Sequence, residues 1–265
     1  MSSIDQIGWF PGHMAQSIRL MHERLALVDV VLEVVDARLP TISANPLLDE
    51  LIGDRPRLVL LGREDLADPQ FTGKWIAYEQ RLGRRALAIN GKQQGSVRNA
   101  LPLLTDLGRG RRTMRAMVVG IPNSGKSTVI NGLAKRIAAK AEDKAGVTRS
   151  LSWFRVSPTL EIMDTPGILP PKIETAQARW QLALCNALPR ERYDAADVVA
   201  RFIDWAAEHR RSVPDLETFA RQRGFLRRGN EIDVHNAAGA YVKDFNVAKF
   251  GRITFEAPPA MELTA

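Results

Sequence analysis

Short runs of Val, Ile and Leu recur through the first two thirds of the chain and predict buried β-strands. These runs are Val30–Val35, Leu58–Leu61, Ala86–Ile89, Met117–Val119 and Leu160–Met163. Longer segments between them repeat apolar residues at helical spacing, namely Met14–Leu27, Gly73–Leu82, Val97–Leu107 and Ser127–Ala139. Strands that alternate with helices predict an α/β fold, in which helices cover both faces of a mostly parallel sheet.

The pattern changes near Pro170 and Pro171. The later segments are helix-compatible and are separated by turn signals; they are Ala176–Leu188, Ala195–Glu208, Asp215–Arg223 and Ile232–Phe245. We therefore predict two domains, an α/β domain over residues 1–172 and a small all-helical domain over residues 173–265.

Charge is distributed unevenly between the two predicted domains. The 265 residues carry a net charge of +7, with 45% hydrophobic and 25% charged residues, which is the composition of a folded globular protein. Residues 1–172 hold 24 Lys and Arg against 17 Asp and Glu, whereas residues 173–265 hold 13 of each. The surplus predicts a polyanionic partner for the first domain.

Other features of composition exclude several classes of protein. The single cysteine, Cys185, excludes an intrachain disulfide framework and a zinc ribbon, and it fits a reducing compartment. No stretch approaches the roughly 20 apolar residues of a membrane span. The N-terminus has neither the basic nor the apolar region of a secretory signal. We expect a cytoplasmic protein with no membrane partner.

A phosphate-binding loop follows the fourth predicted strand. Gly120–Ser127 match the pattern G-x-x-x-x-G-K-[ST] in full, with a strand before them and a helix after them. Glycines let the backbone surround a phosphate, and the helix N-terminus adds a preformed anion site. Lys126 is expected at the β- and γ-phosphates, and the Ser127 hydroxyl is expected to ligate Mg²⁺.

An acidic motif follows the fifth predicted strand. The apolar run ends at Met163, and the next residues are Asp164-Thr165-Pro166-Gly167. Asp164 is predicted to hold the Mg²⁺, and the Gly167 N–H is predicted to sense a γ-phosphate. Thr148, which lies between the two motifs, is a candidate third metal ligand in a switch loop.

The base-reading motif of an ordinary GTPase, N-K-x-D, is missing downstream of Gly167. Upstream, Gly62-Arg63-Glu64-Asp65 occupies the end of the second predicted strand, with its final acid intact. Asp65 is a candidate acceptor for the guanine N–H groups, and Asn90 and Gly91, after the third strand, are candidates to contact guanine O6. This order of motifs indicates a circular permutation of the GTPase fold.

The chain resembles the circularly permuted ribosome-assembly GTPases of the YlqF/RbgA type. The residues that carry the resemblance are Trp9–Met14, Val35–Pro40, Gly120–Ser127, Gly146–Thr148, Asp164–Leu169 and Gly251–Glu256. The resemblance covers nearly the whole chain. It implies a permuted P-loop GTPase domain, a C-terminal helical RNA-binding domain, and a ribosome-associated monomer that hydrolyses GTP to GDP in late maturation of the large ribosomal subunit.

The resemblance also assigns site residues. The expected catalytic residues are His13, Lys126, Thr148 and Gly167, and the expected metal ligands are Ser127, Thr148 and Asp164. The expected nucleotide-binding residues are Arg63, Asp65, Asn90, Gly91, Pro122, Asn123, Ser124, Gly125, Lys126, Ser127, Thr128 and Gly167. Asn123 is in addition a candidate ligand for K⁺, with a turn-stabilising role as the alternative.

Two positions depart from the family pattern. The family has Asn and Lys where this chain has Gly62 and Arg63, so either Asp65 alone maintains the preference for GTP or base choice is relaxed. Arg63 is expected to lie over the purine face as the lysine does. Ile168 stands where Ras-type enzymes have a water-orienting Gln. His13 is the candidate replacement, and helix entry is its alternative role.

Basic clusters favour a contact with rRNA of the large-subunit precursor, and we expect no DNA partner. They are Arg81/Arg84/Arg85, Arg109/Arg111/Arg112/Arg115, Lys135/Arg136/Lys140/Lys144 and Arg221/Arg223/Arg227/Arg228. Trp153, Trp180 and Trp205 are expected in the core rather than stacked on bases. The alternative functions are a non-hydrolysing or ATP-binding P-loop protein that binds RNA, and a small-molecule kinase or generic ATPase.

Overall fold

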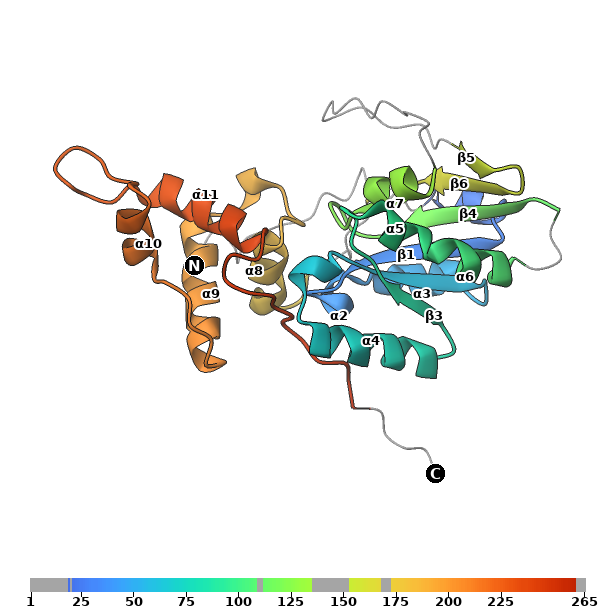
Figure 1. Ribbon diagram of the computed structural model, residues 1–265, viewed down its shortest axis with the longest axis horizontal. Helices are drawn as coiled ribbons and strands as arrows, with labels where there is room; N and C mark the ends of the chain where they lie inside the picture. Colours follow the sequence, from blue (N-terminus) through green and yellow to red (C-terminus); the bar gives the residue numbers. More distant parts are fainter. Residues whose placement is uncertain (1–18, 20, 109–111, 135–152, 168–172, 261–265) are drawn as a thin grey trace. The chain divides into compact units, whose positions relative to one another are not determined.

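The computed structural model describes residue 19 and residues 21–108, 112–134, 153–167 and 173–260. His13, Thr148 and Ile168 lie outside these ranges. The described chain divides into two compact units. Residues 19–167 and 254–260 form an α/β unit, and residues 173–253 form a helical unit (Figure 1). Residues 254–260, which the sequence prediction assigned to the helical domain, are thus grouped with the sheet.

The α/β unit is built on a sheet of six strands among the described residues, in the order β3-β2-β1-β4-β6-β5. The strands are β1 (Val30–Asp36), β2 (Arg57–Gly62), β3 (Arg85–Ala88), β4 (Met114–Val119), β5 (Trp153–Ser157) and β6 (Leu160–Asp164). All neighbours pair in parallel except β5, which is antiparallel to β6. The predicted α/β class with a mostly parallel sheet is confirmed.

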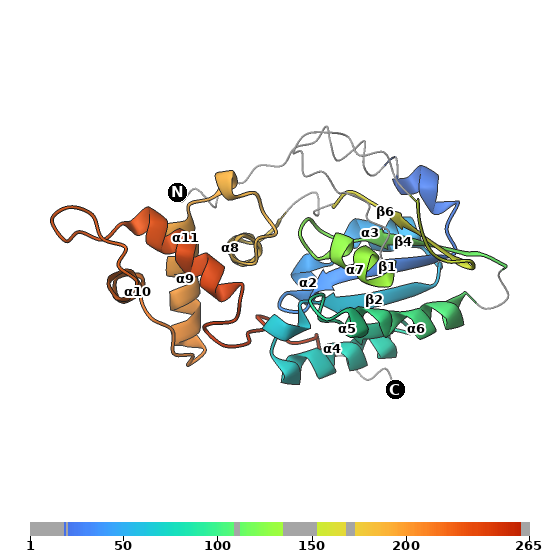
Figure 2. The ribbon, with the colours of Figure 1, turned by 45° about the horizontal axis from the view of Figure 1, so that its top comes forward.

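Helices cover both faces of this sheet (Figure 2). On one face, α5 (Gln94–Arg98), α6 (Ala100–Leu107) and α7 (Lys126–Leu133) pack on the even-numbered side chains of β1 and β2. On the other, α3 (Pro46–Ile52) and α4 (Pro69–Arg81) pack on the odd-numbered ones. The strands are therefore buried on both faces, which explains their continuous runs of Val and Leu.

The sequence analysis did not predict β5, α3 or α2 (Pro40–Ser43). Strand β5 lies at the sheet edge, where its residues are exposed or half-buried, so it carries no buried apolar run. Helix α3 is short and begins at Pro46 behind the cap of Asn45, and α2 is a single turn. The predicted helix Val97–Leu107 is split into α5 and α6 at Asn99.

The sheet topology defines one functional edge. From β1 the chain proceeds to β2 and β3 on one side, whereas β4 and β6 lie on its other side. The crevice outside the carboxyl ends of β1 and β4 is thus a topological switch point, where ligands bind in open α/β sheets. Each predicted nucleotide motif lies at the carboxyl end of a strand: Gly62–Asp65 begins at the last residue of β2, Asn90 follows β3, Gly120 follows β4 and Asp164 ends β6.

The C-terminal segment, residues 254–260, is fastened to the α/β unit by hydrogen bonds. The Phe255 N–H donates to the Arg38 carbonyl at 2.9 Å, and the Trp75 indole N–H donates to the Glu256 carbonyl at 3.1 Å. The Glu256 carboxylate accepts from the backbone N–H groups of Thr41 at 2.6 Å and Ile42 at 3.2 Å, which caps the first turn of α2.

The helical unit contains α8 (Ala176–Leu184), α9 (Ala195–Glu208), α10 (Leu216–Gln222) and α11 (Val234–Phe245). All four begin at side-chain caps, from Thr175, Asp194, Asp215 and Asp233. An aromatic cluster of Phe202, Phe219, Tyr241, Phe245 and Phe250 fills the space between α9, α10 and α11. Burial of Trp180 and Trp205 agrees with their expected core role, whereas Trp153 is 37% exposed. None of the described helices is long and apolar enough to span a membrane.

Candidate functional site

The phosphate loop adopts the conformation that its glycines permit. Gly120, Asn123 and Gly125 all have positive φ, of 147°, 56° and 106°. A Cβ on Gly120 would lie 2.3 Å from the Val34 carbonyl oxygen. The loop therefore passes so close to β1 that position 120 accepts only glycine. Helix α7 then begins at Lys126, and its N-terminal N–H groups are directed at the loop, which is a suitable arrangement for binding phosphate.

Lys126 is held inside this loop. Its ammonium group donates to the carbonyl oxygens of Ile121 at 2.7 Å and Gly120 at 3.3 Å. Burial lowers the pKa of Lys126 to about 8, and the charge of Asp164 opposes the shift. The carboxylate predicted to hold the metal, at the end of β6, and the lysine predicted to hold the phosphates, at the start of α7, therefore interact electrostatically.

Gly167 lies directly over the phosphate loop. A Cβ at this position would be 2.6 Å from the backbone nitrogen and Cα of Pro122 and 2.9 Å from Nζ of Lys126. The preceding Thr165 is buried, and its hydroxyl donates to the Val118 carbonyl at 2.6 Å. The end of β6 is thus anchored to β4, and the backbone of Gly167 is held close to Pro122 and Lys126 of the phosphate loop.

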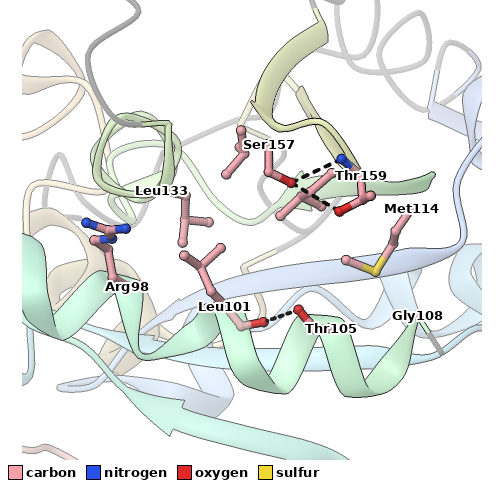
Figure 3. A pocket seen from close by; sticks show the side chains of 10 residues that line it. Arg98, Leu101, Thr105, Gly108, Met114, Leu133, Ser157 and Thr159 are labelled. Carbon is pink, nitrogen blue, oxygen red and sulfur yellow. Dashed lines mark hydrogen bonds between the residues drawn. The ribbon is translucent and has the colours of Figure 1, made fainter. Parts of the chain in front are cut away.

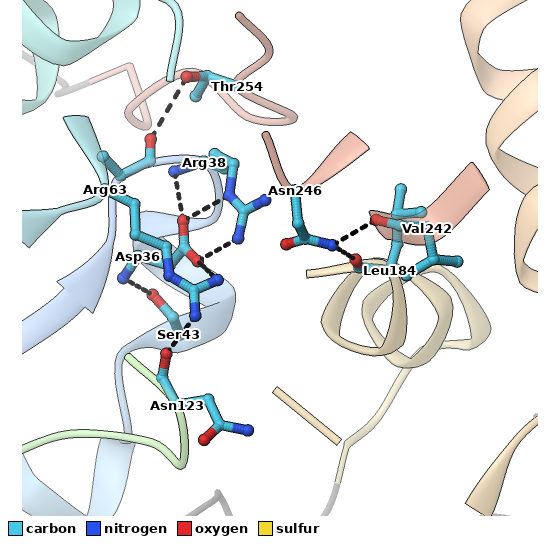
Figure 4. Close-up of polar contacts among 10 residues, drawn as sticks. Asp36, Arg38, Ser43, Arg63, Asn123, Leu184, Val242, Asn246 and Thr254 are labelled. Carbon is cyan, nitrogen blue, oxygen red and sulfur yellow. Dashed lines mark hydrogen bonds and ion pairs between the residues drawn. The ribbon is translucent and has the colours of Figure 1, made fainter. Parts of the chain in front are cut away.

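The base-reading loop approaches the phosphate loop through Gly62. A Cβ on Gly62 would lie 3.1 Å from the Ser124 carbonyl oxygen, a tighter contact than most side chains tolerate. The next residue, Arg63, has a left-handed backbone with φ of 58°. Its guanidinium donates to the carbonyl of Asn123 at 2.5 Å and to the carboxylate of Asp36 at 3.3 Å (Figure 4). The expected position of Arg63 over a purine face stays a prediction.

Asp36 is the centre of a buried polar network at the end of β1 (Figure 4). Its Oδ1 accepts from the backbone N–H and Nε of Arg38, and its Oδ2 accepts from Nη2 of Arg38 at 2.8 Å and from Arg63. Its own N–H donates to Ser43 Oγ at 2.8 Å. Burial opposes ionisation, but Arg38 and Arg63 outweigh it and hold the pKa of Asp36 below its ordinary value.

The candidate base-reading residues lie close together. Asp65 is half-buried, and its Oδ2 forms an ion pair with Nζ of Lys92 at 2.8 Å. The Asn90 side chain accepts from the Lys92 N–H at 3.0 Å within the loop after β3, and the ion pair of Lys92 with Asp65 connects that loop to the loop after β2. A Cβ on Gly91 would lie 2.7 Å from Thr128 on α7, which connects the same loop to the phosphate-binding helix.

The structure therefore gathers most of the predicted site at one edge of the sheet. Among the predicted residues at this edge, Asn123, Ser127 and Thr128 are exposed, and the Ser124 hydroxyl is buried with no hydrogen-bond partner among the described residues. His13 and Thr148 lie outside the described residues. The sequence analysis assigned no role in the site to Asp36 or Arg38. Their place directly after the predicted strand Val30–Val35 could have marked them as candidate site residues.

A separate cavity of about 410 Å³ opens at the opposite edge of the sheet (Figure 3). Its walls come from α6, from Leu133 at the end of α7, from the start of β4 and from the turn between β5 and β6. Met114 and Leu160, the first residues of β4 and β6, line it. It lies at the amino ends of these strands and does not belong to the nucleotide edge.

Known proteins resemble this chain along nearly all of its length. A family model described as 50S ribosome-binding GTPase matches residues 115–231. Ribosome biogenesis GTPase A of Bacillus cereus is 37% identical, over 95% of this chain and 94% of the relative. The protein of the same name from Thermotoga maritima is 32% identical, over 95% of each chain.

Two solved structures have the same fold. The GDP-bound structure of TM YlqF is 30% identical, with a TM-score of 0.71, and the match covers 91% of this chain and 99% of that chain. GNP-bound YlqF from T. maritima is 28% identical with the same TM-score, over 93% and 100% of the two chains.

The family model begins at β4, so it includes the phosphate loop but leaves Gly62–Asp65 and Asn90 upstream of its first residue. That arrangement agrees with the permuted order predicted from the motifs. These relatives do not favour the alternative of a non-hydrolysing or ATP-binding RNA-binding protein. The chain belongs to the ribosome biogenesis GTPase A family and is a circularly permuted GTPase of ribosome assembly.

Proposed function

We propose that this GTPase acts in late maturation of the large ribosomal subunit, with GTP bound across the carboxyl edge of the sheet. The observation that supports the proposal is the convergence of the loops after β2, β3, β4 and β6 at the switch point. In this arrangement the phosphates lie in the loop of residues 120–127, and the base lies between the loops that carry Asp65 and Asn90.

Magnesium fits the residues at the phosphate end of the site. Ser127 is exposed at the start of α7, and the charge of Asp164 acts on the neighbouring Lys126. We assign Ser127 and Asp164 to the ion, with Thr148 as the third protein ligand. When bound, Mg²⁺ neutralises charge on the β- and γ-phosphates. Lys126 binds the same phosphates, and the Gly167 N–H donates to the γ-phosphate.

GTP is the preferred nucleotide in this proposal because Asp65 remains in place to accept two guanine N–H groups. Adenine offers no matching pair of donors at this position. The ion pair between Asp65 and Lys92 is mostly exposed on the lysine side, so guanine displaces Lys92 at small cost. Asn90 and Gly91 supply the contact to guanine O6.

Hydrolysis in this chain has to proceed without a glutamine after Gly167. We propose that His13 orients the attacking water, since an imidazole with an ordinary pKa near 6.5 accepts a proton readily at neutral pH. Docking on the large-subunit precursor brings the segment of His13 to the γ-phosphate. Asn123 supplies an exposed side chain beside the phosphates, where it can bind K⁺.

The proposed macromolecular partner is rRNA of the large-subunit precursor, bound by a cytoplasmic monomer. The basic clusters that support it are partly neutralised. Arg221, Arg223 and Arg227 pair with Glu217, Asp244 and Asp233, respectively. Non-specific attraction of rRNA by the helical unit is therefore weak. The net positive charge of the α/β unit supplies the long-range electrostatic attraction of rRNA.

A titration of fluorescent GTP and ATP tests nucleotide binding. Lys126→Ala is expected to lose GTP binding at least 100-fold while its circular dichroism spectrum stays unchanged, and Lys74→Ala on α4 is the matched lysine control. Wild-type protein is expected to bind GTP in preference to ATP. If Lys126→Ala binds GTP as tightly as wild type, the phosphate-loop assignment is wrong.

Turnover measurements test the proposed partner and the role of His13. We expect slow GTP hydrolysis by the protein alone and faster hydrolysis with large ribosomal subunits, and the stimulated rate should fall steeply as salt rises. His13→Ala should lose the stimulation but retain GTP binding. Equal rates for wild type and His13→Ala, with and without subunits, would contradict the proposal.

A further inference from the structure

We propose that Arg63 is a positioning residue that joins the base-reading loop to the phosphate loop, in place of the side chain that Gly62 lacks. The inference rests on the proposed binding of GTP at this edge. It concerns a position where the chain departs from the family pattern, and it gives the arginine a role other than covering the purine.

The two loops have to keep a fixed distance because one nucleotide spans both. Gly62 approaches Ser124 closely but has no side chain, so it supplies no side-chain hydrogen bond between the loops. The Arg63 guanidinium crosses the same gap and donates to the Asn123 carbonyl at 2.5 Å. The acceptor belongs to the phosphate loop and the donor to the base-reading loop.

A second contact fixes the direction of the guanidinium. Nη1 of Arg63 lies 3.3 Å from Oδ2 of Asp36, and the Asp36 side chain is only 5% exposed. Arg38, whose side chain is 1% exposed, holds the other side of the same carboxylate with paired hydrogen bonds. Asp36 therefore cannot turn away, and Arg63 is aimed at the phosphate loop by a rigid anchor at the end of β1.

Only an arginine has the geometry for this contact. The planar guanidinium presents separate N–H donors to the Asp36 carboxylate and to the Asn123 carbonyl, whereas a lysine offers one compact ammonium. The left-handed backbone at Arg63 is an uncommon conformation for a residue with a side chain, which is consistent with a position determined by tertiary contacts. Gly62 and Arg63 thus act together: the glycine permits the close approach, and the arginine ties the loops.

The test uses ligands that engage one loop or both. GTP and GDP span the two loops, whereas inorganic tripolyphosphate binds the phosphate loop alone. For Arg63→Ala we expect the affinities for GTP and GDP to fall together by about 10- to 100-fold, the usual range for a lost hydrogen bond to a charged group. Tripolyphosphate affinity should change less than threefold. In turnover, KM should rise with little change in kcat, because the tie is made before and during the reaction alike.

Matched variants separate this role from general damage. Arg84→Ala removes an arginine from another carboxylate network of the same unit and should leave all three affinities unchanged. Arg63→Lys retains the positive charge and should still lose at least fivefold toward GTP and GDP.

Several outcomes would overturn the inference. It is wrong if Arg63→Ala and Arg63→Lys bind GTP like wild type, if GTP affinity falls while GDP affinity does not, or if tripolyphosphate affinity falls as much as that for GTP. A selective loss of guanine over adenine preference, with loop contacts intact, would assign Arg63 to the base instead. If wild-type protein binds no GTP at all, the proposed function fails rather than the tie.

Discussion

Strand β1 carries two buried carboxylates three residues apart, Asp36 and Glu33, and their surroundings differ. Asp36 stands at the carboxyl end of the strand, between two guanidinium groups and the phosphate loop. Glu33 stands in the middle of the strand and pairs with Arg57 at 3.1 Å. Arg57 in turn contacts Asp49 on α3, and Arg84 connects Asp49 to Glu79 on α4.

The pKa values of Asp36 and Glu33 are shifted in opposite directions by these different surroundings. For Asp36, burial opposes ionisation, but the positive charges of Arg38 and Arg63 prevail and the pKa is lowered. For Glu33, burial prevails over Arg57, with Asp49 adding to it, and the pKa is raised. The network at the functional edge has more cationic than acidic members, which suits an anionic ligand. The network between α3 and α4 has more acidic members, Glu33, Asp49 and Glu79 against Arg57 and Arg84.

Removal of the Asp36 carboxylate should have the largest effect. Asp36→Ala leaves the buried Arg38 without its main acceptor, and loss of one partner from a buried pair typically costs about 3–5 kcal/mol. We expect urea unfolding to show a loss of this size, together with weaker GTP binding by the folded fraction. Asp49→Asn, on a carboxylate that is 55% exposed, is the control and should cost less than about 1 kcal/mol. Equal losses for the two variants would contradict the comparison.

Joint replacement of Glu33 and Arg57 by apolar residues should be far milder. Such swaps of a whole buried pair are often neutral or stabilising by about 1–4 kcal/mol, because the cost of burying charge disappears. For Glu33→Leu/Arg57→Leu we expect a free energy of unfolding at or above that of wild type, with unchanged GTP affinity. Urea titration and fluorescent GTP binding measure the two quantities. A tenfold loss of GTP affinity would show that this network also serves the site.

The pH dependence of stability should have opposite signs for the two carboxylates. A lowered pKa means that folded Asp36 contributes stability above its ordinary pKa of about 4 and loses it as the pH falls. A raised pKa means that Glu33 favours folding when protonated and loses that contribution as the pH rises above its ordinary pKa.

Urea midpoints between pH 3.5 and pH 7 can separate these two contributions. The stability gap between wild type and Asp36→Asn should widen with pH, and the gap between wild type and Glu33→Gln should change in the opposite direction. A pKa that differs by one between the folded and unfolded protein corresponds to about 1.4 kcal/mol of stability. Parallel pH profiles for the two variants would show that their surroundings do not differ as described.

The smallest expected effect concerns the exposed cation next to the base-reading acid. Lys92→Ala removes an ion pair whose lysine is 69% exposed, so stability should change by less than about 1 kcal/mol. GTP affinity should rise slightly, up to about fivefold, because guanine no longer competes with Lys92 for Asp65. Titration with fluorescent GTP checks the direction. A loss of affinity would instead give Lys92 a direct part in binding.

Features that depend on local pattern were predictable from the sequence. The Val and Leu runs of β1, β2 and β4 are buried on both faces, so they stand out as strands. Gly120–Ser127 could be identified because a phosphate loop needs fixed residue types at fixed spacing. Strand β5 was missed because an edge strand exposes one face and has no apolar run.

Features that depend on tertiary contacts were not predictable. The roles of Asp36 and Arg38 depend on contacts among β1, α2 and the base-reading loop. The spacing of residue types along the sequence does not predict these contacts. The sequence alone predicts Arg63 over the base, which stays a prediction, and it gives no sign of the contact with Asp36, because a guanidinium is attracted to a purine as well as to a carboxylate. Its observed direction is decided by Asp36, which lies 27 positions earlier in the sequence.

The hydrogen bonds of Phe255 and Glu256 have a consequence for dissecting the protein. Within the described residues, the chain leaves the α/β unit before residue 173 and returns to it at Thr254, so the helical unit stands between two parts of the α/β unit in the order of the chain. A fragment that ends at residue 172 lacks the acceptor for the Trp75 indole and the carboxylate that caps α2. To obtain the α/β unit without the helical unit, the segment of residues 254–260 would have to be added to such a fragment as a separate peptide.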